Sequence, residues 1–194
     1  SAMASRSSAP RASSPVPGAR SLWLSDGSAS GTREVAGWSV GSYFDGEMLE
    51  LNGRLLYSGF SHGYGMELVV SDGTAAGTHM ILDLNPGLAA SSPSQFVALA
   101  GIAYFTAYDA NAGRELWRSD GTAPGTWRVA DLLPGTSGAS PHELLVAGGA
   151  LWFAAGGNTG IELWTSDGSV TGTRIVADLR SGAASSSPSQ IRSI

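Results

Sequence analysis

The sequence predicts an all-β fold built from repeated four-stranded sheets, and the first reason is a recurring phrase. The phrase reads ELWRSDGTAPGTWRVAD over residues 115–131, and related copies begin at Met66, Ile161 and, in weaker form, Ser21. Each copy carries one aspartate in a turn, and these lie 46, 48 and 47 residues apart: Asp26, Asp72, Asp120 and Asp167. A fixed period of about 40 to 50 residues is typical of propeller blades or solenoid units.

The second reason is the pattern inside one period. Four runs of six residues, each rich in β-branched and aromatic types and bounded by Gly, Pro, Asn or Asp, occupy 94–99, 102–107, 114–119 and 126–131. None holds the 3.6-residue periodicity of a helix over ten residues. Four antiparallel strands in a unit of this length describe a propeller blade.

The chain therefore divides, in prediction, into a flexible leader at 1–19 and one β-propeller repeat domain at 20–194. The leader is rich in Ser, Ala and Pro, and its first three residues resemble a cloning remnant. The repeat units cover 21–37, 38–84, 85–132 and 133–179, with a final strand at 189–194. This gives fifteen strands, one short of four complete blades, so the chain is either a propeller of about four blades or an incomplete segment of a larger one.

Composition narrows the function classes. With 42% hydrophobic and 14% charged residues, the chain can bury a core. The net charge is −5 and the basic residues are scattered, which excludes nucleic acid and anionic membrane as expected partners. No apolar run approaches the roughly eighteen residues needed for membrane insertion. The absence of Cys excludes thiolate metal sites and a cysteine nucleophile. A Gly- and Ser-rich composition favours an extracellular or cell-surface location.

The four turn aspartates are predicted to be structural. In Ser119-Asp120-Gly121-Thr122 the carboxylate can accept backbone N–H bonds across its own turn, and the glycine can adopt the positive φ that a tight turn requires. The same interpretation applies to Asp26, Asp72 and Asp167.

These residues carry a family resemblance. Glu115-Leu116-Trp117, followed by Asp120-Gly121-Thr122, resembles the ELWxxDGT repeat family of bacterial, often myxobacterial, secreted proteins. The turn is also similar to the Asp-box hairpin, and the blades to kelch blades. The resemblance covers 21–194. It implies an extracellular β-propeller of uncharacterised function and supplies no catalytic residues.

Two sets of loops are candidate sites. The loops that follow the fourth strands begin with an aspartate in each repeat, and such a ring of carboxylates could hold calcium, which prefers six to eight oxygen ligands. Alternatively, each aspartate caps its strand exit and orders the following turn. The residues concerned are Asp83, Asp131 and Asp178.

The loops between second and third strands combine aromatic, amide and carboxylate side chains. Sugar recognition uses such combinations, because a ring stacks on the sugar while polar groups bind its hydroxyls. The candidate ligand-binding residues are His62, Tyr64, Tyr108, Asp109, Asn111 and Asn158.

The favoured function is a non-catalytic extracellular binding or adhesion module that presents its loops to a glycan or a surface protein. One alternative is a structural repeat segment that self-associates into a homo-oligomer, and a second is a polysaccharide-acting enzyme. Enzyme chemistry has little support, because His62, His79 and His142 fall at unrelated points of the repeat and no catalytic motif is present.

Overall fold

The computed structural model describes residues 2–7, 20–40, 47–61 and 63–193. These residues form fifteen β-strands and no helix, so the all-β prediction is confirmed. The chain separates into two compact units, Ser1–Ser92 and Pro93–Ile194. Each unit is described by itself below.

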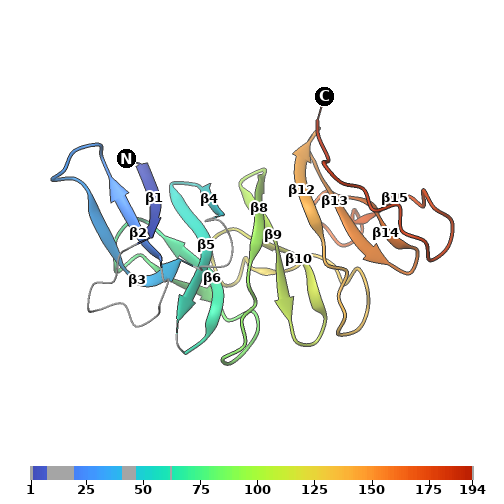
Figure 1. Ribbon diagram of the computed structural model, residues 1–194, viewed down its shortest axis with the longest axis horizontal. Helices are drawn as coiled ribbons and strands as arrows, with labels where there is room; N and C mark the ends of the chain where they lie inside the picture. Colours follow the sequence, from blue (N-terminus) through green and yellow to red (C-terminus); the bar gives the residue numbers. More distant parts are fainter. Residues whose placement is uncertain (1, 8–19, 41–46, 62, 194) are drawn as a thin grey trace. The chain divides into compact units, whose positions relative to one another are not determined.

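The first unit contains one antiparallel sheet (Figure 1). Its strand order is β1-β2-β3-β5-β6-β7. β4 lies off this path and pairs with the same edge of β5 as β3 does. The strands are β1 (Ala2–Ser7), β2 (Arg20–Ser25), β3 (Arg33–Val40), β4 (Met48–Leu51), β5 (Arg54–Ser61), β6 (Gly65–Ser71) and β7 (His79–Leu82).

The expectation of a flexible leader is wrong for Ala2–Ser7, which form β1 antiparallel to β2 with Ala2 opposite Ser25 and Ser7 opposite Arg20. This pairing uses backbone groups, so it needs none of the apolar alternation on which strand prediction depends. The rest of the predicted leader, residues 1 and 8–19, lies outside the described residues.

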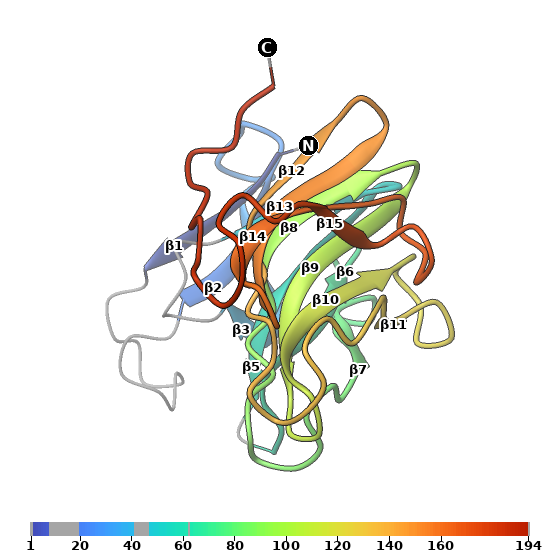
Figure 2. The same ribbon diagram turned by 90° about the vertical axis from the view of Figure 1, so that its right-hand side faces the viewer.

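The second unit contains two four-stranded antiparallel sheets in simple up-and-down order. One sheet runs β8-β9-β10-β11, as Figure 2 shows, and the other β12-β13-β14-β15. The strands are β8 (Ser94–Leu99), β9 (Ile102–Asp109), β10 (Gly113–Ser119), β11 (Trp127–Arg128), β12 (His142–Ala147), β13 (Ala150–Gly157), β14 (Gly160–Ser166) and β15 (Arg174–Ala177).

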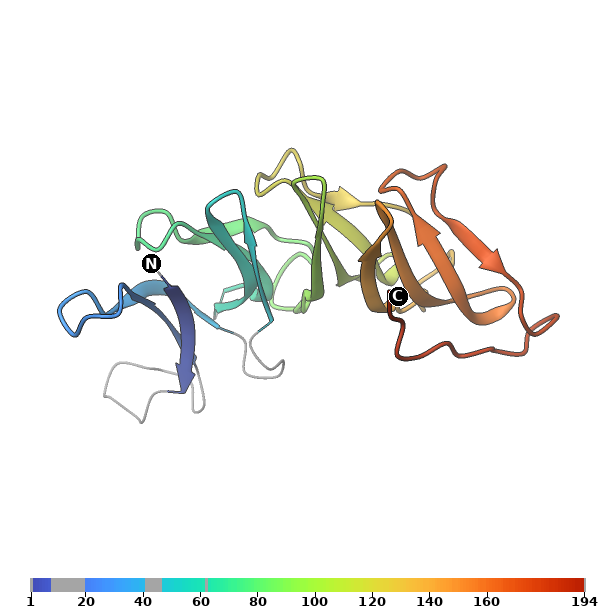
Figure 3. The same cartoon turned by 90° about the horizontal axis from the view of Figure 1, so that it is seen from above.

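The four strands predicted for one period are confirmed, although the fourth is shorter than expected. β11 ends at Arg128, but the Val129 N–H still donates to the Leu116 carbonyl at 2.8 Å. The predicted final strand is wrong for 189–193, because these residues pair with no strand in the described chain. After β15 the chain continues as an irregular ribbon to its C-terminus (Figure 3), and residue 194 lies outside the described range.

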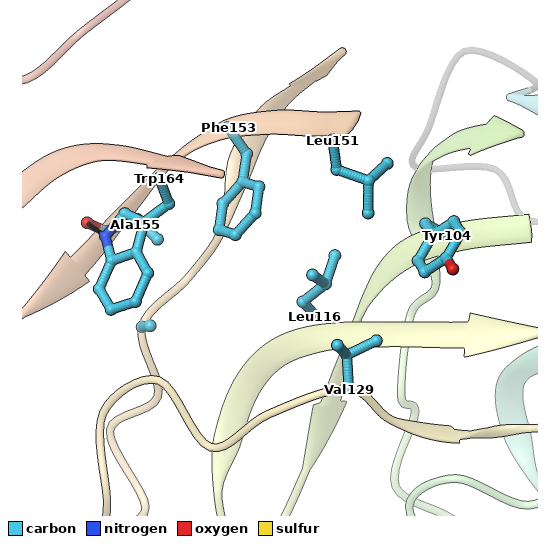
Figure 4. Packing of buried hydrophobic residues seen from close by; sticks show 8 residues of the cluster. Tyr104, Leu116, Val129, Leu151, Phe153, Ala155 and Trp164 are labelled. Atoms are coloured by element: carbon cyan, nitrogen blue, oxygen red, sulfur yellow. Dashed lines mark hydrogen bonds between the residues drawn. The ribbon is translucent and has the colours of Figure 1, made fainter. Parts of the chain in front are cut away.

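Alternate residues of neighbouring strands build the cores. In the second unit, side chains of β13 and β14 point toward those of β9 and β10 (Figure 4), so the two sheets share one apolar cluster. The Phe153 and Trp164 rings stack within it, with centroids 6.4 Å apart. Its buried members are Tyr104, Leu116, Val129, Ala139, Leu151, Phe153, Ala155 and Trp164. The first unit has its own cluster of Leu22, Val35, Leu55, Tyr57 and Val69.

Candidate functional site

The turn between the third and fourth strands of every repeat holds one turn aspartate in the same way. Asp72 Oδ1 accepts the Thr74 N–H at 2.8 Å and the Thr74 hydroxyl at 2.7 Å. Asp26, Asp120 and Asp167 accept the matching pair of bonds from the residue two positions later. These hydrogen bonds lower the pKa of all four carboxyls.

A glycine five residues after each aspartate makes this turn possible. A Cβ added to Gly77 would lie 2.1 Å from Asp72 Oδ1, and one added to Gly125 would lie 1.9 Å from Asp120 Oδ1. Real atoms cannot approach so closely, so the carboxylate fills the space that any side chain at that position would need. The turn phrase is therefore fixed by packing as well as by hydrogen bonds.

A second repeated carboxylate lies in the third strand and holds the loop that leaves the fourth strand. Glu67 is 0% exposed; its Oε2 accepts the Leu84 N–H at 2.9 Å and its Oε1 accepts the Ser91 N–H at 2.8 Å. The Ser91 hydroxyl adds a third bond to Oε2 at 2.6 Å. We call this arrangement the carboxylate latch, and the segment from 83 to 91 its latch loop.

The latch recurs with equal spacing in the second unit. Glu115 accepts the N–H groups of Leu132 and Ala139 at 3.2 and 2.9 Å, without a hydroxyl, because residue 139 is alanine. Glu162 accepts the N–H groups of Leu179 and Ser186 at 3.3 and 3.0 Å, and the Ser186 hydroxyl at 2.5 Å. The corresponding latch loops are residues 131–139 and 178–186. All three glutamates are therefore engaged in holding backbone.

The latches differ in electrostatics. Burial raises the pKa of Glu67 to about 7 and also raises that of Glu115. The pKa of Glu162 is lowered, first by the Ser186 hydroxyl.

The two sets of candidate loops meet at one end of each sheet. A Cβ on Gly65, which ends the loop between β5 and β6, would lie 3.0 Å from the Leu88 carbonyl of the latch loop. Gly113 lies against Ser137 and Gly138 in the same way, and Gly160 against Ala184 and Ser185. The structure thus brings each second-to-third strand loop against its own latch loop, and we call this end of a repeat its loop face.

The candidate ligand-binding residues lie on these loop faces. Tyr64 is 43% exposed and Tyr108 37%, while Asn111 and Asn158 are also exposed. The latch loop adds Leu88, whose carbonyl lies against Gly65 and whose surface is 77% exposed. His62 lies outside the described residues.

Arg128, which the sequence analysis did not single out, brings two candidate residues together. Its guanidinium lies 3.4 Å from Asp109 Oδ2 and 3.7 Å from Asp131 Oδ2. Asp109 Oδ1 also accepts the Asn111 N–H at 2.8 Å, which shapes the loop after Tyr108. Asp109 and Asp131 therefore share an arginine partner.

Two of the three aspartates considered for calcium, Asp83 and Asp178, make the hydrogen bonds of the turn-capping alternative. Asp83 Oδ2 accepts the Gly87 N–H at 3.2 Å, and Asp178 Oδ2 accepts the Gly182 N–H at 3.3 Å. Asp83 belongs to the first unit, whereas Asp131 and Asp178 belong to the second. No group of three His, Asp or Glu side chains within the described ranges is placed to hold a metal ion.

A second feature that sequence reasoning missed is Trp127 on β11. Its ring is 43% exposed, and the Arg118 guanidinium lies 4.2 Å from the ring centroid, a cation–π contact. The signal was present in the repeats: this position follows the Gly-Thr pair of each turn and holds Arg33, His79, Trp127 and Arg174. A position that varies inside an otherwise constant phrase marks an exposed surface.

No protein-family model matches the chain, and no curated protein matches it. Among solved structures it is similar to Pyrococcus horikoshii acylaminoacyl peptidase in an orthorhombic crystal form, with a TM-score of 0.46 and 17% identity. That match covers 83% of this chain, which spans 23% of the length of the peptidase. The described residues contain no helix that is long and apolar enough to cross a membrane.

Proposed function

We propose that the four-stranded repeats are β-propeller blades of the ELWxxDGT type and that the chain is a non-catalytic extracellular module that binds a glycan through its loop faces. The observation that carries this proposal is the meeting of two loops at the end of each repeat, with exposed aromatic rings beside carboxylate and amide groups.

The contrast between fixed and variable positions supports a binding role. The turn aspartates and latch glutamates accept bonds from donors at fixed positions of the repeat, and their acceptor atoms stabilise loops. The loop-face residues differ between repeats, with Tyr64 in one and Tyr108, Asp109 and Asn111 in the next. A rigid frame that carries variable exposed loops is how many binding proteins present their recognition residues.

Tyr108 offers the clearest sugar-binding geometry. It lies at the end of β9, next to Asp109, whose position is set by Arg128 and by the Asn111 N–H. A tyrosine ring can stack on the apolar face of a sugar while these neighbours bind hydroxyl groups.

A glycan array probed with the purified chain tests the proposal, once with calcium and once with chelator. We expect selective binding that falls by about tenfold or more in Tyr108→Ala and Tyr64→Ala, since about 1.4 kcal/mol is a factor of ten. The matched control is Val170→Ala, which removes a 68% exposed side chain from the turn at the opposite end of β14.

Binding that survives both tyrosine substitutions, or no glycan binding in either buffer, would contradict the proposal. Loss of binding in the chelator buffer would show that a cation takes part in glycan binding.

A further inference from the structure

The loop face of the third repeat contains a charged cluster centred on Arg128. The guanidinium of this residue on β11 lies 3.4 Å from Asp109 Oδ2 and 3.7 Å from Asp131 Oδ2. Asp109 ends β9, where the loop to β10 begins, and Asp131 begins the latch loop. One planar guanidinium, which presents several N–H donors, therefore joins the two loops that form this loop face.

The cluster is specific to the third repeat. Eight residues after the turn aspartate stands Arg128, where the second and last repeats have Met80 and Ile175. The partner position, opposite the glycine that begins the third strand, holds Asp109 in the third repeat, Ser61 in the second and Gly157 in the last. The second and last repeats pair their third and fourth strands without an arginine–aspartate contact. The pair is therefore not needed for the frame of the repeat.

Arg128 also changes the role of the aspartate that begins the latch loop. In the second and last repeats this aspartate accepts the N–H of the glycine four residues later, at 3.2 Å for Asp83 and 3.3 Å for Asp178. In the described part of the third repeat, Asp131 accepts no bond from Gly135, and its Oδ2 lies beside Arg128 instead. A carboxylate that orders a turn in two repeats is thus held beside a second carboxylate in the third.

The exposed groups of this cluster are complementary to a pair of hydroxyls. The side chains of Arg128, Asp109 and Asp131 are 29%, 18% and 37% exposed, so a ligand can reach all three. Carboxylates only accept hydrogen bonds and a guanidinium only donates them, whereas a hydroxyl does both. Two hydroxyls on adjacent carbons of a sugar can therefore bind the carboxylates and the guanidinium together, beside the exposed ring of Tyr108.

The charge of the cluster disfavours an acidic ligand. The two loops, residues 108–113 and 131–139, carry no charged side chains other than Asp109 and Asp131, so with Arg128 the cluster has one negative charge in excess. Arg114, which follows the first loop, directs its guanidinium to the hydroxyls of Ser94 and Thr106. A carboxylated sugar would meet like charge here, and like charges placed together weaken binding.

We propose that Arg128 is the specificity-determining residue of the third loop face, which selects neutral hexoses with two adjacent hydroxyls over acidic sugars. This inference rests on the glycan-binding role proposed above and names the class of sugar. Without Arg128, Asp109 and Asp131 lose the cation that they share. The loop face then has two negative charges and favours a sugar that carries a protonated amine.

Affinity measurements with matched sugars test the inference. The probes are oligomers of glucose, galactose and mannose, each compared with its uronate and its amino-sugar form. We expect the unmodified chain to bind a neutral form about tenfold more tightly than the matching uronate. Arg128→Met introduces the residue of the second repeat; we expect it to weaken neutral binding about tenfold and to make the amino form the tightest ligand. Arg174→Met, which removes an exposed arginine from β15, is the control and should change neither value.

Arg128→Lys separates charge from geometry. Lysine keeps the positive charge but lacks the planar fork, so we expect a loss of a few-fold with the order of neutral above uronate unchanged. If Arg128→Met binds no probe, this variant decides: the retained order supports the inference, and equal binding of the two forms overturns it.

The outcomes distinguish this inference from the proposed function. An unmodified chain that prefers uronates, or Arg128→Met with the same order of ligands as the unmodified chain, would overturn the role of Arg128 and leave glycan binding in place. If the unmodified chain binds none of these probes, the inference is wrong, and the glycan array with Tyr108→Ala decides the proposed function separately.

Discussion

The first and third latch loops, residues 83–91 and 178–186, make the same contacts and yet give their glutamates opposite electrostatic behaviour. Glu67 and Glu162 each accept two backbone N–H groups and one serine hydroxyl. The pKa of Glu67 is nevertheless raised to about 7, mainly by burial, while that of Glu162 is lowered, first by its serine hydroxyl.

The difference lies in the residues outside the hydrogen bonds. Leu84 and Asn85 are 4% and 3% exposed, whereas their counterparts Leu179 and Arg180 are exposed. The carboxylate of Asp83 further raises the pKa of Glu67, and the guanidinium of Arg180 lowers that of Glu162. Identical hydrogen-bond donors therefore do not fix the pKa of a buried carboxyl, because desolvation by the surrounding protein also contributes.

Removing the glutamate should give the largest difference in stability between the first and the third latch. Glu67→Ala leaves the Leu84 and Ser91 N–H groups buried without acceptors, so we expect the free energy of unfolding to fall by about 3 to 5 kcal/mol. Glu162→Ala should cost less, because water can reach the exposed third loop. Chemical denaturation of both variants measures the difference. Equal losses would show that the burial of Leu84 and Asn85 does not change the contribution of the latch to stability.

Truncating the leucine at the start of each latch loop, Leu84 or Leu179, should give the next largest difference in stability. Leu84→Ala empties a buried site and is expected to destabilise the fold by about 2 to 4 kcal/mol. Leu179→Ala removes a side chain that is 63% exposed, and we expect a change within about 0.5 kcal/mol. Thermal unfolding of the two variants gives the comparison. A large loss of stability in Leu179→Ala would contradict the exposure of Leu179 in the third latch loop.

The pH dependence of stability should differ in sign between the two latches. Because the folded pKa of Glu67 lies above its usual value of 4.5, its contribution favours the fold at low pH and is lost as the pH rises from 4.5 through about 7. The lowered pKa of Glu162 has the opposite effect, a contribution present above 4.5 and lost on acidification.

Stability measured between about pH 3 and pH 8 should therefore show a neutral-side decline that Glu67→Gln removes and, below pH 4.5, an acid-side decline that Glu162→Gln reduces. If both substitutions change the stability over the same pH interval, the two carboxyls have the same environment, and the predicted difference between the latches is wrong.

The smallest expected effect comes from the middle latch, where Ala139 replaces the serine of the other two. Ala139→Ser restores a hydroxyl near Glu115, so we expect a gain of about 0.5 to 1.5 kcal/mol and a lower Glu115 pKa. Denaturation of this variant and carboxyl titration by nuclear magnetic resonance measure the two quantities. A destabilised variant would show that the buried alanine site has no room for the oxygen.

The repeat period was sufficient to predict the strand pattern, because side-chain alternation and turn residues report local structure. Strands 94–99 and 114–119 appear within one residue of their expected limits. The termini could not be predicted in this way. β1 is held by backbone pairing with β2, and 189–193 has a strand sequence but pairs with no strand among the described residues.

The candidate site was predictable in part. The loops that meet around Tyr64 and Tyr108 were selected from their composition. In the structure both side chains are exposed, Tyr64 in the loop before β6 and Tyr108 at the end of β9. Arg128 was missed because its link between Asp109 and Asp131 spans strands, which spacing along the chain does not reveal. Trp127 was missed because its exposure depends on β11 lying at the edge of its sheet.

The carboxylate latch also has a consequence for how such a gene can change length. Its donors always follow the glutamate by 17 and 24 residues, so every latch spans less than the length of one period. Duplication or deletion of one whole period by recombination therefore leaves each remaining latch with all of its partners. The copy number of repeats can vary without any compensating substitution in the hydrogen-bonded frame, whereas a change by part of a period would separate a glutamate from the loop that it holds.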